Sequence, residues 1–170
     1  MACFEDAISF WKVWNNLPHS DPGNFFFKVD DQGMRQLKSV NLYEVGQQKE
    51  MNKISSLVMF KTGVKPEWED PANSNGGNFL IKMKQDDPNL KELWNQLVCG
   101  LVSGTLPNVE NICGIRFLEK HANAKFEIWT NYHKKDGAAH KELENKLGDL
   151  LGGVLGINAP AIEFNKHGES

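Results

Sequence analysis

The sequence has no long apolar run and few cysteines. Its uninterrupted apolar stretches are only a few residues long, whereas a membrane-spanning helix needs about 20, so no membrane segment is expected. The first residues, MACFEDAISFWK, lack the basic start and the small-residue cleavage site of a secretory signal. Three scattered cysteines argue against a disulfide framework or a zinc knuckle: Cys3, Cys99 and Cys113. These absences predict a cytoplasmic or nuclear protein with reduced thiols.

An excess of positive charge is also missing. The 19 basic and 22 acidic residues give a net charge of -3, so the chain does not coat nucleic acid by bulk electrostatics. Any nucleic-acid site therefore has to be small and local. Apolar residues, in contrast, make up 40% of the 170 residues and include ten Phe and five Trp, which is enough to fill one core. We expect one domain spanning residues 1–170, and a monomer.

Signatures of catalysis are absent as well. The sequence contains no GxxxxGK[ST], no GxGxxG after a strand, no HExxH and no GxSxG. Local sequence places no base beside Cys99 or Cys113, so both are expected to act as small hydrophobic residues. The histidines match no metal-binding spacing and are expected on the solvated surface: His19, His121, His133, His140 and His167. The chain is therefore predicted to have no enzyme activity, metal or cofactor.

The N-terminal third is predicted to hold one helix and one hairpin. Apolar residues recur at three- and four-residue steps over 4–16, from Phe4 through Ile8 to Trp11, which predicts a helix that ends before Pro18. FFFKV and LKSVNLYEV flank the turn DDQG, which predicts a hairpin over 25–45. The polar segment QQKEMNKIS (47–55) is predicted to form one or two helical turns.

The rest of the chain is predicted to form five strands interleaved with two helices. Strands are predicted at 55–61, 78–84, 112–120, 124–132 and 160–166, and the 78–84 strand alternates with Phe79, Ile81 and Met83 on one face. Helices are predicted from about residue 88 to 100–104, with Asp87 as the cap, and over 138–156. No repeating strand-helix-strand unit is present. This order favours an α+β domain whose mainly antiparallel sheet is covered by helices on one face.

One loop carries candidate binding chemistry, KPEWED at 65–70. An exposed aromatic with an adjacent carboxylate can stack on a base and accept hydrogen bonds from its edge, as Trp68 and Glu69 would. Guanine presents two adjacent N–H donors, which a carboxylate matches. A positively charged N7-methylguanine adds a cation–π attraction of up to ~2 kcal/mol. The alternative is that Trp68 folds back as a plug on the core, with Glu69 in solvent.

In this order, three segments resemble the eukaryotic translation initiation factor 4E family of messenger-RNA cap-binding proteins. They are VMFKTGVKPEWEDPANSNGGNFLI (58–81), LKELWNQLVCGLVSG (90–104) and VENICGIRFLEKHANAKFEIWTN (109–131). The resemblance implies a curved sheet with three main helices on its convex face. It also implies that the ligand is capped messenger RNA, with Trp68 stacked on 7-methylguanine, Glu69 paired with its N1 and N2 donors, and Trp129 against the methyl group. The phosphate contacts of the family fall on Asn78, Lys120 and Lys125.

Two departures affect this implied site. Asn78 replaces an arginine of the family and Lys120 replaces another, with His121 and Lys134 or Lys135 as candidates to compensate. The second stacking tryptophan of the family has no counterpart, because its loop reads DDQGMRQ here. Met34 is the preferred substitute, ahead of Arg35, Tyr43 or a Phe of 25–27. Because stacking is worth ~1 to 3 kcal/mol per aromatic face, loss of one tryptophan predicts cap binding weakened roughly tenfold to a hundredfold.

The N-terminal region can be aligned with the family in two ways. In one, helix 4–16 is the family's dorsal helix and hairpin 25–45 fills a vacant sheet position by rearranged connectivity. In the other, 47–55 is a shrunken dorsal helix and 1–17 is an addition.

The family's dorsal helix binds scaffold and inhibitory proteins through a YxxxxLΦ peptide. SFWKVWNNL (9–17) resembles this helix, so Trp11 with Ile8 would dock the peptide; the alternative is that Trp11 is a core residue. Asn95 and Cys99 stand where the neighbouring helix is apolar in the family, which predicts an altered partner preference. Two rival functions remain: a cap-binding repressor that does not engage the 4G scaffold, and an interaction module whose cap pocket has decayed.

Overall fold

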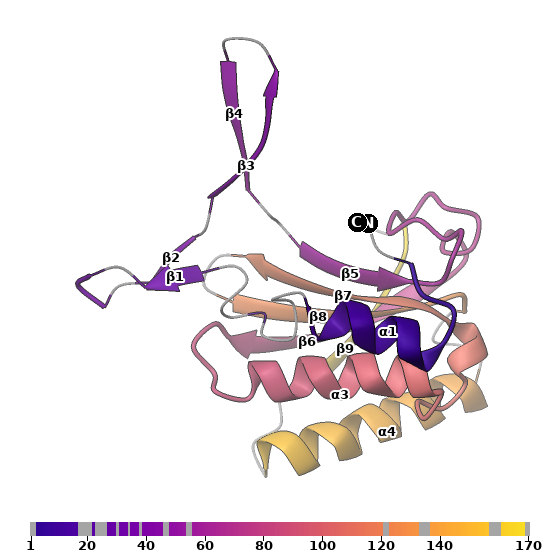
Figure 1. The fold of residues 1–170 in the computed structure, drawn as a ribbon. Coiled ribbons are helices and arrows are strands. Elements are labelled where there is room, and N and C mark those ends of the chain that lie inside the picture. The colour runs from indigo at the N-terminus through magenta and orange to yellow at the C-terminus, as the bar shows by residue number, and fades with distance from the viewer. Residues whose placement is uncertain are drawn as a thin grey trace.

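A five-stranded antiparallel sheet forms the centre of the molecule (Figure 1). The computed structural model describes residues 3–16, 22, 27–29, 31–33, 35–37, 39–45, 48–53, 56–120, 123–132, 137–156 and 161–168. The strands lie in the order β5-β7-β8-β6-β9. Their bounds are Ser56–Phe60 for β5, Gly77–Lys84 for β6, Ile112–Lys120 for β7, Asn123–Thr130 for β8 and Ile162–Lys166 for β9. All five predicted strands are thus confirmed to within two residues.

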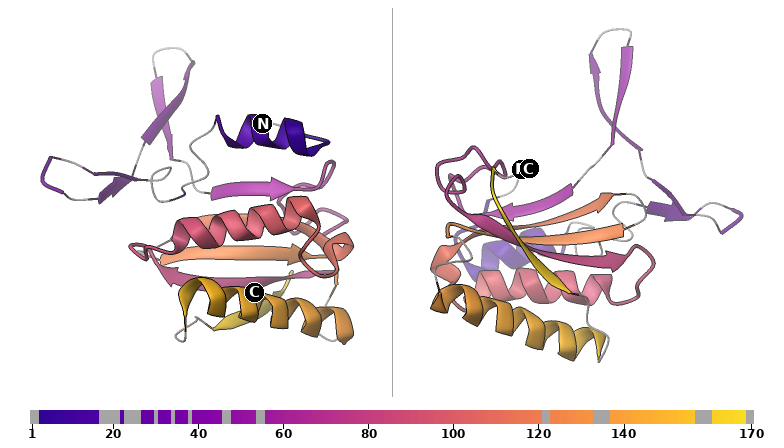
Figure 2. Two further views of the ribbon diagram at one scale, coloured as in Figure 1. Left: turned by 60° about the horizontal axis from the view of Figure 1, so that its bottom comes forward. Right: turned by 180° about the vertical axis from the view of Figure 1, so that it is seen from behind.

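Helices α1, α3 and α4 lie side by side on the convex face of this sheet, with α3 between the other two (Figures 1 and 2). They span Ala7–Trp14, Leu90–Ser103 and Ala138–Leu155, and a short 3-10 helix, η2, spans Val109–Asn111. Helix α1 begins at a capping box, in which the Asp6 carboxylate accepts from the Ser9 backbone N–H at 2.7 Å. Helix α3 ends at Gly104, whose φ of 69° favours glycine. The α+β architecture with helices on one face agrees with the prediction.

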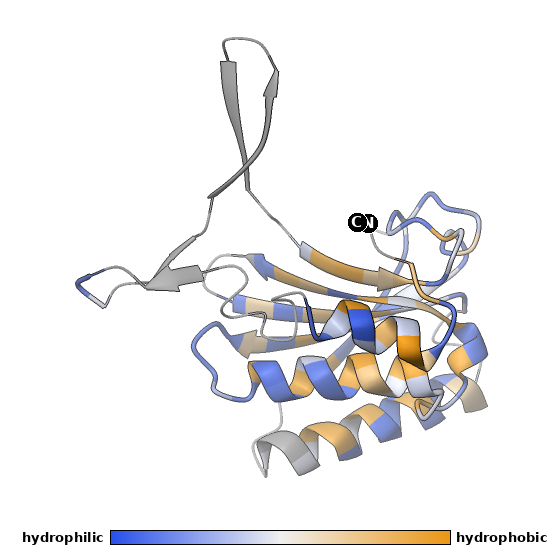
Figure 3. Ribbon diagram, in the orientation of Figure 1, coloured by the Kyte–Doolittle hydropathy of each residue, from blue (hydrophilic) through white to orange (hydrophobic). Residues whose placement is uncertain are grey.

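The core lies between the helices and the sheet. Phe79, Ile81 and Met83 of β6 are all buried there, which confirms the alternation read from the sequence. Phe117 of β7 and Phe126 of β8 pack edge to face with centroids 4.9 Å apart. The ribbon coloured by hydropathy shows apolar and polar positions alternating along α3 and α4, as expected of helices with one buried face (Figure 3). The opposite, concave face carries no described helix.

The predicted cap of the second helix is wrong. The N-cap of α3 is Asn89, which makes no side-chain capping hydrogen bond. Asp87 instead accepts from the backbone N–H of Asn89 at 2.9 Å through Oδ1. Asp87 therefore shapes the turn before the helix, as aspartate commonly does two residues ahead of a backbone donor.

The segment 27–53 differs from the prediction. Strand β1 (Phe27–Val29) pairs with β2 (Arg35–Leu37), and β3 (Ser39–Val45) pairs with β4 (Gln48–Lys53). The hairpin predicted over 25–45 is thus confined to β1 and β2. The helical turns predicted over 47–55 are wrong, because only two residues separate the paired Val45 and Gln48. A connection that short favours a hairpin despite the polar sequence.

The two hairpins also bear on the two alignments of the N-terminal region with the family. Neither hairpin joins the five-stranded sheet, so the expectation that the hairpin fills a vacant sheet position is wrong. The second alignment needs a helix within 47–55, where the structure has β4. Helix α1, in contrast, lies beside α3 (Figure 2). No described helix combines the length and apolar character needed to cross a bilayer.

Candidate functional site

A row of five residues crosses the concave face of the sheet. The strand register aligns Phe60, Gly114, Trp129, Asn78 and Asn165 across β5, β7, β8, β6 and β9. Because side chains alternate along a strand, these residues point away from the helices, opposite to core neighbours such as Phe79. The row ends near the loop 61–76, which follows β5 and leads into β6. The candidate site is where this loop meets the row.

Loop 61–76 is held by its own polar side chains. The Asp70 carboxylate accepts from the backbone N–H groups of Lys65 and Ala72, at 3.0 and 2.9 Å, and these two hydrogen bonds lower the pKa of Asp70 below its usual range. The amide of Asn73 donates to the backbone carbonyls of Lys65 and Glu67, both at 2.8 Å. The backbone around Trp68 is therefore fixed from both sides.

This loop presents Trp68 to solvent. The side chain is 53% exposed, and its neighbour Glu69 is exposed as well. The alternative in which Trp68 plugs the core is therefore wrong. A large exposed indole on a hydrogen-bonded loop is a preformed stacking surface, and the adjacent carboxylate is available as an acceptor.

Trp129 of β8 is fixed in the row rather than exposed. Only 6% of it is accessible, and its Nε1–H donates to Oε2 of Glu127 at 2.9 Å. Phe60 packs edge to face on it at a centroid distance of 5.5 Å. On the same face, Nη1 of Arg116 lies 3.9 Å from Oε2 of Glu127. Trp129 can therefore offer an indole edge of fixed orientation.

The end of β9 connects the two tryptophans. The His167 ring lies 4.4 Å from the Trp129 ring, centroid to centroid. A Cβ placed on the next residue, Gly168, would lie 3.9 Å from the six-membered ring of Trp68. His167 thus contacts Trp129, and the backbone of the next residue passes close to Trp68.

The expectation that the histidines are solvated is wrong for two of them. His140 and His167 are buried, His140 between Phe79 and Phe164 on the convex side, and His167 on the concave side. His167 is the site residue that the sequence did not reveal, because its partner Asn73 lies 94 positions away. The only local signal is its place directly after a predicted strand.

Two of the three residues assigned to the phosphates, Asn78 and Lys125, lie on the concave face. Asn78 is buried between Trp129 and Asn165, and Lys125 is half-buried on β8. The register places Lys125 opposite Lys82, a cation that the sequence reasoning did not consider. Lys82 is paired with Glu163 at 2.8 Å.

Several predicted residues lie beyond what the structure describes. Lys120 is the last residue of β7, but its side chain is outside the described part, and Met34, His121, Lys134 and Lys135 lie outside the described residues altogether. The same holds for Phe25 and Phe26 and for the side chains of Phe27, Arg35 and Tyr43. What covers the second face of the base is therefore still a prediction.

Helix α1 carries a second exposed apolar surface. Phe10 and Trp14 are buried, whereas Ile8 and Trp11 are 71% and 46% exposed. The alternative in which Trp11 is a core residue is therefore wrong. Asn95 on α3 is half-buried. Cys99 lines a groove with α4 residues, on the side of α3 away from α1, and burial followed by the charge of Glu92 raises the pKa of its thiol.

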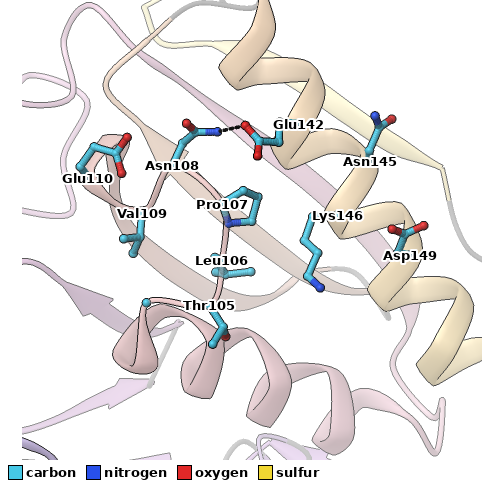
Figure 4. Close-up of a pocket in the computed structure, with 11 residues that line it drawn as sticks. Thr105, Leu106, Pro107, Asn108, Val109, Glu110, Glu142, Asn145, Lys146 and Asp149 are labelled. Atoms are coloured by element: carbon cyan, nitrogen blue, oxygen red, sulfur yellow. Dashed lines mark hydrogen bonds between the residues drawn. The ribbon is translucent and has the colours of Figure 1, made fainter.

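A cleft of about 590 Å³ lies on the convex side, between the loop 104–110 and α4 (Figure 4). Among the described residues that line it are three carboxylates, those of Glu110, Glu142 and Asp149, and one cation, Lys146. Asn108 donates to Glu142 at 2.9 Å across its mouth. Such an acidic lining repels an anionic nucleotide, so this cleft is not the candidate site.

Comparison with known proteins gives consistent matches. The family model described as "Eukaryotic initiation factor 4E" matches residues 39–170. The chain is 32% identical over 118 residues to "Eukaryotic translation initiation factor 4E-2" of Schizosaccharomyces pombe, covering 68% of this chain and 46% of that protein. The chain spans about half the length of the curated relatives it matches.

Two solved structures share the fold. Ascaris suum eIF4E-3, in complex with the m7G cap, superposes on this chain with a TM-score of 0.65 at 22% sequence identity. The match covers 100% of this chain and 78% of the Ascaris suum chain. Caenorhabditis elegans eIF4E-3, in complex with the 4E-binding protein Mextli and a cap analog, superposes with a TM-score of 0.61 at 20% sequence identity. That match covers 96% of this chain and 76% of the Caenorhabditis elegans chain. At these identities the likeness is one of fold.

Proposed function

The chain belongs to the eukaryotic initiation factor 4E family, and on this premise we propose that it binds the 7-methylguanosine cap of messenger RNA in translation initiation. The observation that carries the proposal is the exposed Trp68 beside Glu69, on a hydrogen-bonded loop next to Trp129. The Ascaris suum protein of the same fold was solved with the m7G cap, which supports the assignment.

In this proposal each residue has one role. Trp68 stacks on the methylated purine, and the positive charge of that base strengthens the stacking by up to ~2 kcal/mol. Glu69 accepts from the N1 and N2 donors of guanine, which adenine cannot supply as a pair. Trp129 borders the methyl group with its fixed edge. Asn78, Lys120 and Lys125 contact the phosphates, and Met34 covers the second face of the base.

The protein is proposed to bind and release the cap without covalent chemistry, as a monomer in the cytoplasm. The described residues include no group of His, Cys, Asp and Glu arranged to hold a metal ion, and the proposed recognition uses none. Stacking and hydrogen bonding are sufficient for selection of a methylated base.

Titration of tryptophan fluorescence with 7-methyl-GTP and with GTP tests this function. We expect 7-methyl-GTP to bind more tightly, and Trp68→Ala to remove the difference, because a stacking face is worth about tenfold to a hundredfold in affinity. Trp11→Ala is the matched control, since it removes another exposed tryptophan on the opposite side of the sheet. Equal affinity of the unmodified chain for both nucleotides would refute cap binding and favour an interaction module with a decayed pocket.

A second activity is proposed for α1: docking of a scaffold or inhibitory protein through a YxxxxLΦ peptide. The exposed Ile8 and Trp11 form its apolar surface. The Caenorhabditis elegans protein of this fold was solved with a 4E-binding protein, which supports such a surface here. Asn95 makes the neighbouring helix more polar, which favours a repressor that binds caps without the 4G scaffold over a standard initiation factor. The expectation that Cys99 belongs to the same surface is wrong, because Cys99 lines the groove between α3 and α4.

A further inference from the structure

We propose that His167 is a positioning residue of the cap site, which holds the loop carrying Trp68 and Glu69 at a fixed place relative to Trp129. This inference rests on the proposed function. His167 need not contact the cap itself. It acts through the loop backbone on one side and through the Trp129 ring on the other.

The contacts of His167 join three separate parts of the chain. Its Nδ1 lies 2.8 Å from the backbone carbonyl oxygen of Asn73, and its backbone N–H donates to the carbonyl of Gly76 at 3.0 Å. Its ring packs on Trp129 at 4.4 Å. Because a carbonyl oxygen only accepts, Nδ1 carries a proton in this contact. His167 thus ties loop 61–76 to β8 from the end of β9.

The start of this loop is tied to β7 and η2 by Lys61, which donates to the backbone carbonyls of Cys113, Val109 and Glu110. Beyond Lys61, few other contacts among the described residues tie the loop to the sheet. The hydrogen bonds of Asp70 and of the Asn73 amide stay within the loop, so they fix its shape but not its position. Cys113 of β7 reaches the Ala72 carbonyl through its thiol at 3.4 Å, which is a weak donor. The two bonds from His167 are therefore the stronger anchors near Asn73 and Gly76.

Because His167 is buried, removal of its hydrogen bond to Asn73 should destabilise the position of the loop. His167 is only 8% exposed, so water has little access to replace the Nδ1 hydrogen bond. Gly168 follows with a φ of +77°, a conformation that favours glycine, and the chain passes close to the Trp68 ring at this residue. A shift of His167 is thereby passed to both indoles.

Three substitutions separate the roles of the ring and of the donor. His167→Phe keeps an aromatic ring against Trp129 but removes the hydrogen bond to Asn73. His167→Asn removes the ring contact with Trp129 but places an amide N–H close to the position of Nδ1. His140→Phe is the matched control, because His140 is equally buried but packs against Phe79 on the convex side.

We expect His167→Phe to weaken 7-methyl-GTP binding about three- to tenfold, the range for loss of one hydrogen bond to a buried backbone group. His167→Asn should restore affinity to within about twofold of the unmodified chain, because the donor is retained. His140→Phe should leave affinity unchanged even if it lowers the melting temperature.

Amide hydrogen exchange without nucleotide supplies a second readout, independent of cap binding. His167→Phe should raise exchange in peptides covering 70–76, where Asn73, Ser74 and Gly76 donate backbone hydrogen bonds, and leave β7 unchanged. A purely structural role would raise exchange in β7 as well, and that result would overturn the inference, as would unchanged exchange in 70–76. Faster exchange with unchanged affinity would also overturn it. Equal affinity of the unmodified chain for 7-methyl-GTP and GTP would refute the proposed function and this inference together.

Discussion

At the scale of single residues, the site depends on polar side chains that shape a loop around one exposed indole. Trp68 and Glu69 are adjacent in sequence, so their combination could be read directly. The hydrogen bonds of Asp70 and Asn73 could not be predicted in this way. Several turn conformations are compatible with the sequence of this loop, and each would give these side chains different backbone partners. The burial of His167 was not predictable either, because its partner Asn73 lies 94 positions away in the sequence.

Asp70 gives a residue-scale prediction. Asp70→Asn should weaken 7-methyl-GTP binding about two- to fivefold at pH 7. Asp70 accepts from Lys65 through Oδ2 and from Ala72 through Oδ1, and the amide nitrogen that replaces one of these oxygens cannot accept a hydrogen bond. Isothermal titration calorimetry measures this, and Asp149→Asn on α4, lining the far cleft, is the control. Unchanged affinity in Asp70→Asn would show that the carboxylate does not organise the loop.

The lowered pKa of Asp70 also sets the direction of a pH effect. The pKa of Asp70 in the folded chain lies below its value of 3.8 in the unfolded chain. The stabilisation that the ionised Asp70 provides is therefore fully present above pH 3.8 and is lost as the pH falls through the folded-state pKa. Melting temperatures of the unmodified chain and of Asp70→Asn should therefore converge below pH 3.8.

At the scale of elements, strongly periodic segments were predictable and polar ones were not. The alternation of Phe79, Ile81 and Met83 fixed both the strand and its buried face. The segment 48–53 has no such pattern, so its pairing with β3 could not be predicted from periodicity. The pairing of Lys82 with Glu163 and its place opposite Lys125 needed the register of three strands.

Helix α1 provides the element-scale prediction. A YxxxxLΦ peptide should bind the unmodified chain, and Trp11→Ala should weaken it about tenfold or more, because an exposed aromatic anchor is typical of binding hot spots. Fluorescence anisotropy of a labelled peptide measures this, with Trp68→Ala as the control of similar exposure. Equal binding to Trp11→Ala would exclude this face of α1 as the docking surface.

At the scale of the whole molecule, the proposed cap site and the α1 surface lie on opposite faces of one sheet (Figure 1). The sequence predicted this layered α+β architecture because its helices and strands alternate along the chain in the family's order. It did not predict that the segment 27–53 forms two hairpins outside the five-stranded sheet. Propensity and turn signals locate strands, but they do not state which sheet a strand joins.

A structure of the chain with 7-methyl-GTP tests the central claim most directly. The account predicts the purine plane stacked on the Trp68 ring at about 3.5 to 4 Å, with N1 and N2 directed at the Glu69 carboxylate and the methyl group beside Trp129. A nucleotide bound elsewhere on the molecule, or a purine that leaves Trp68 uncovered, would contradict it.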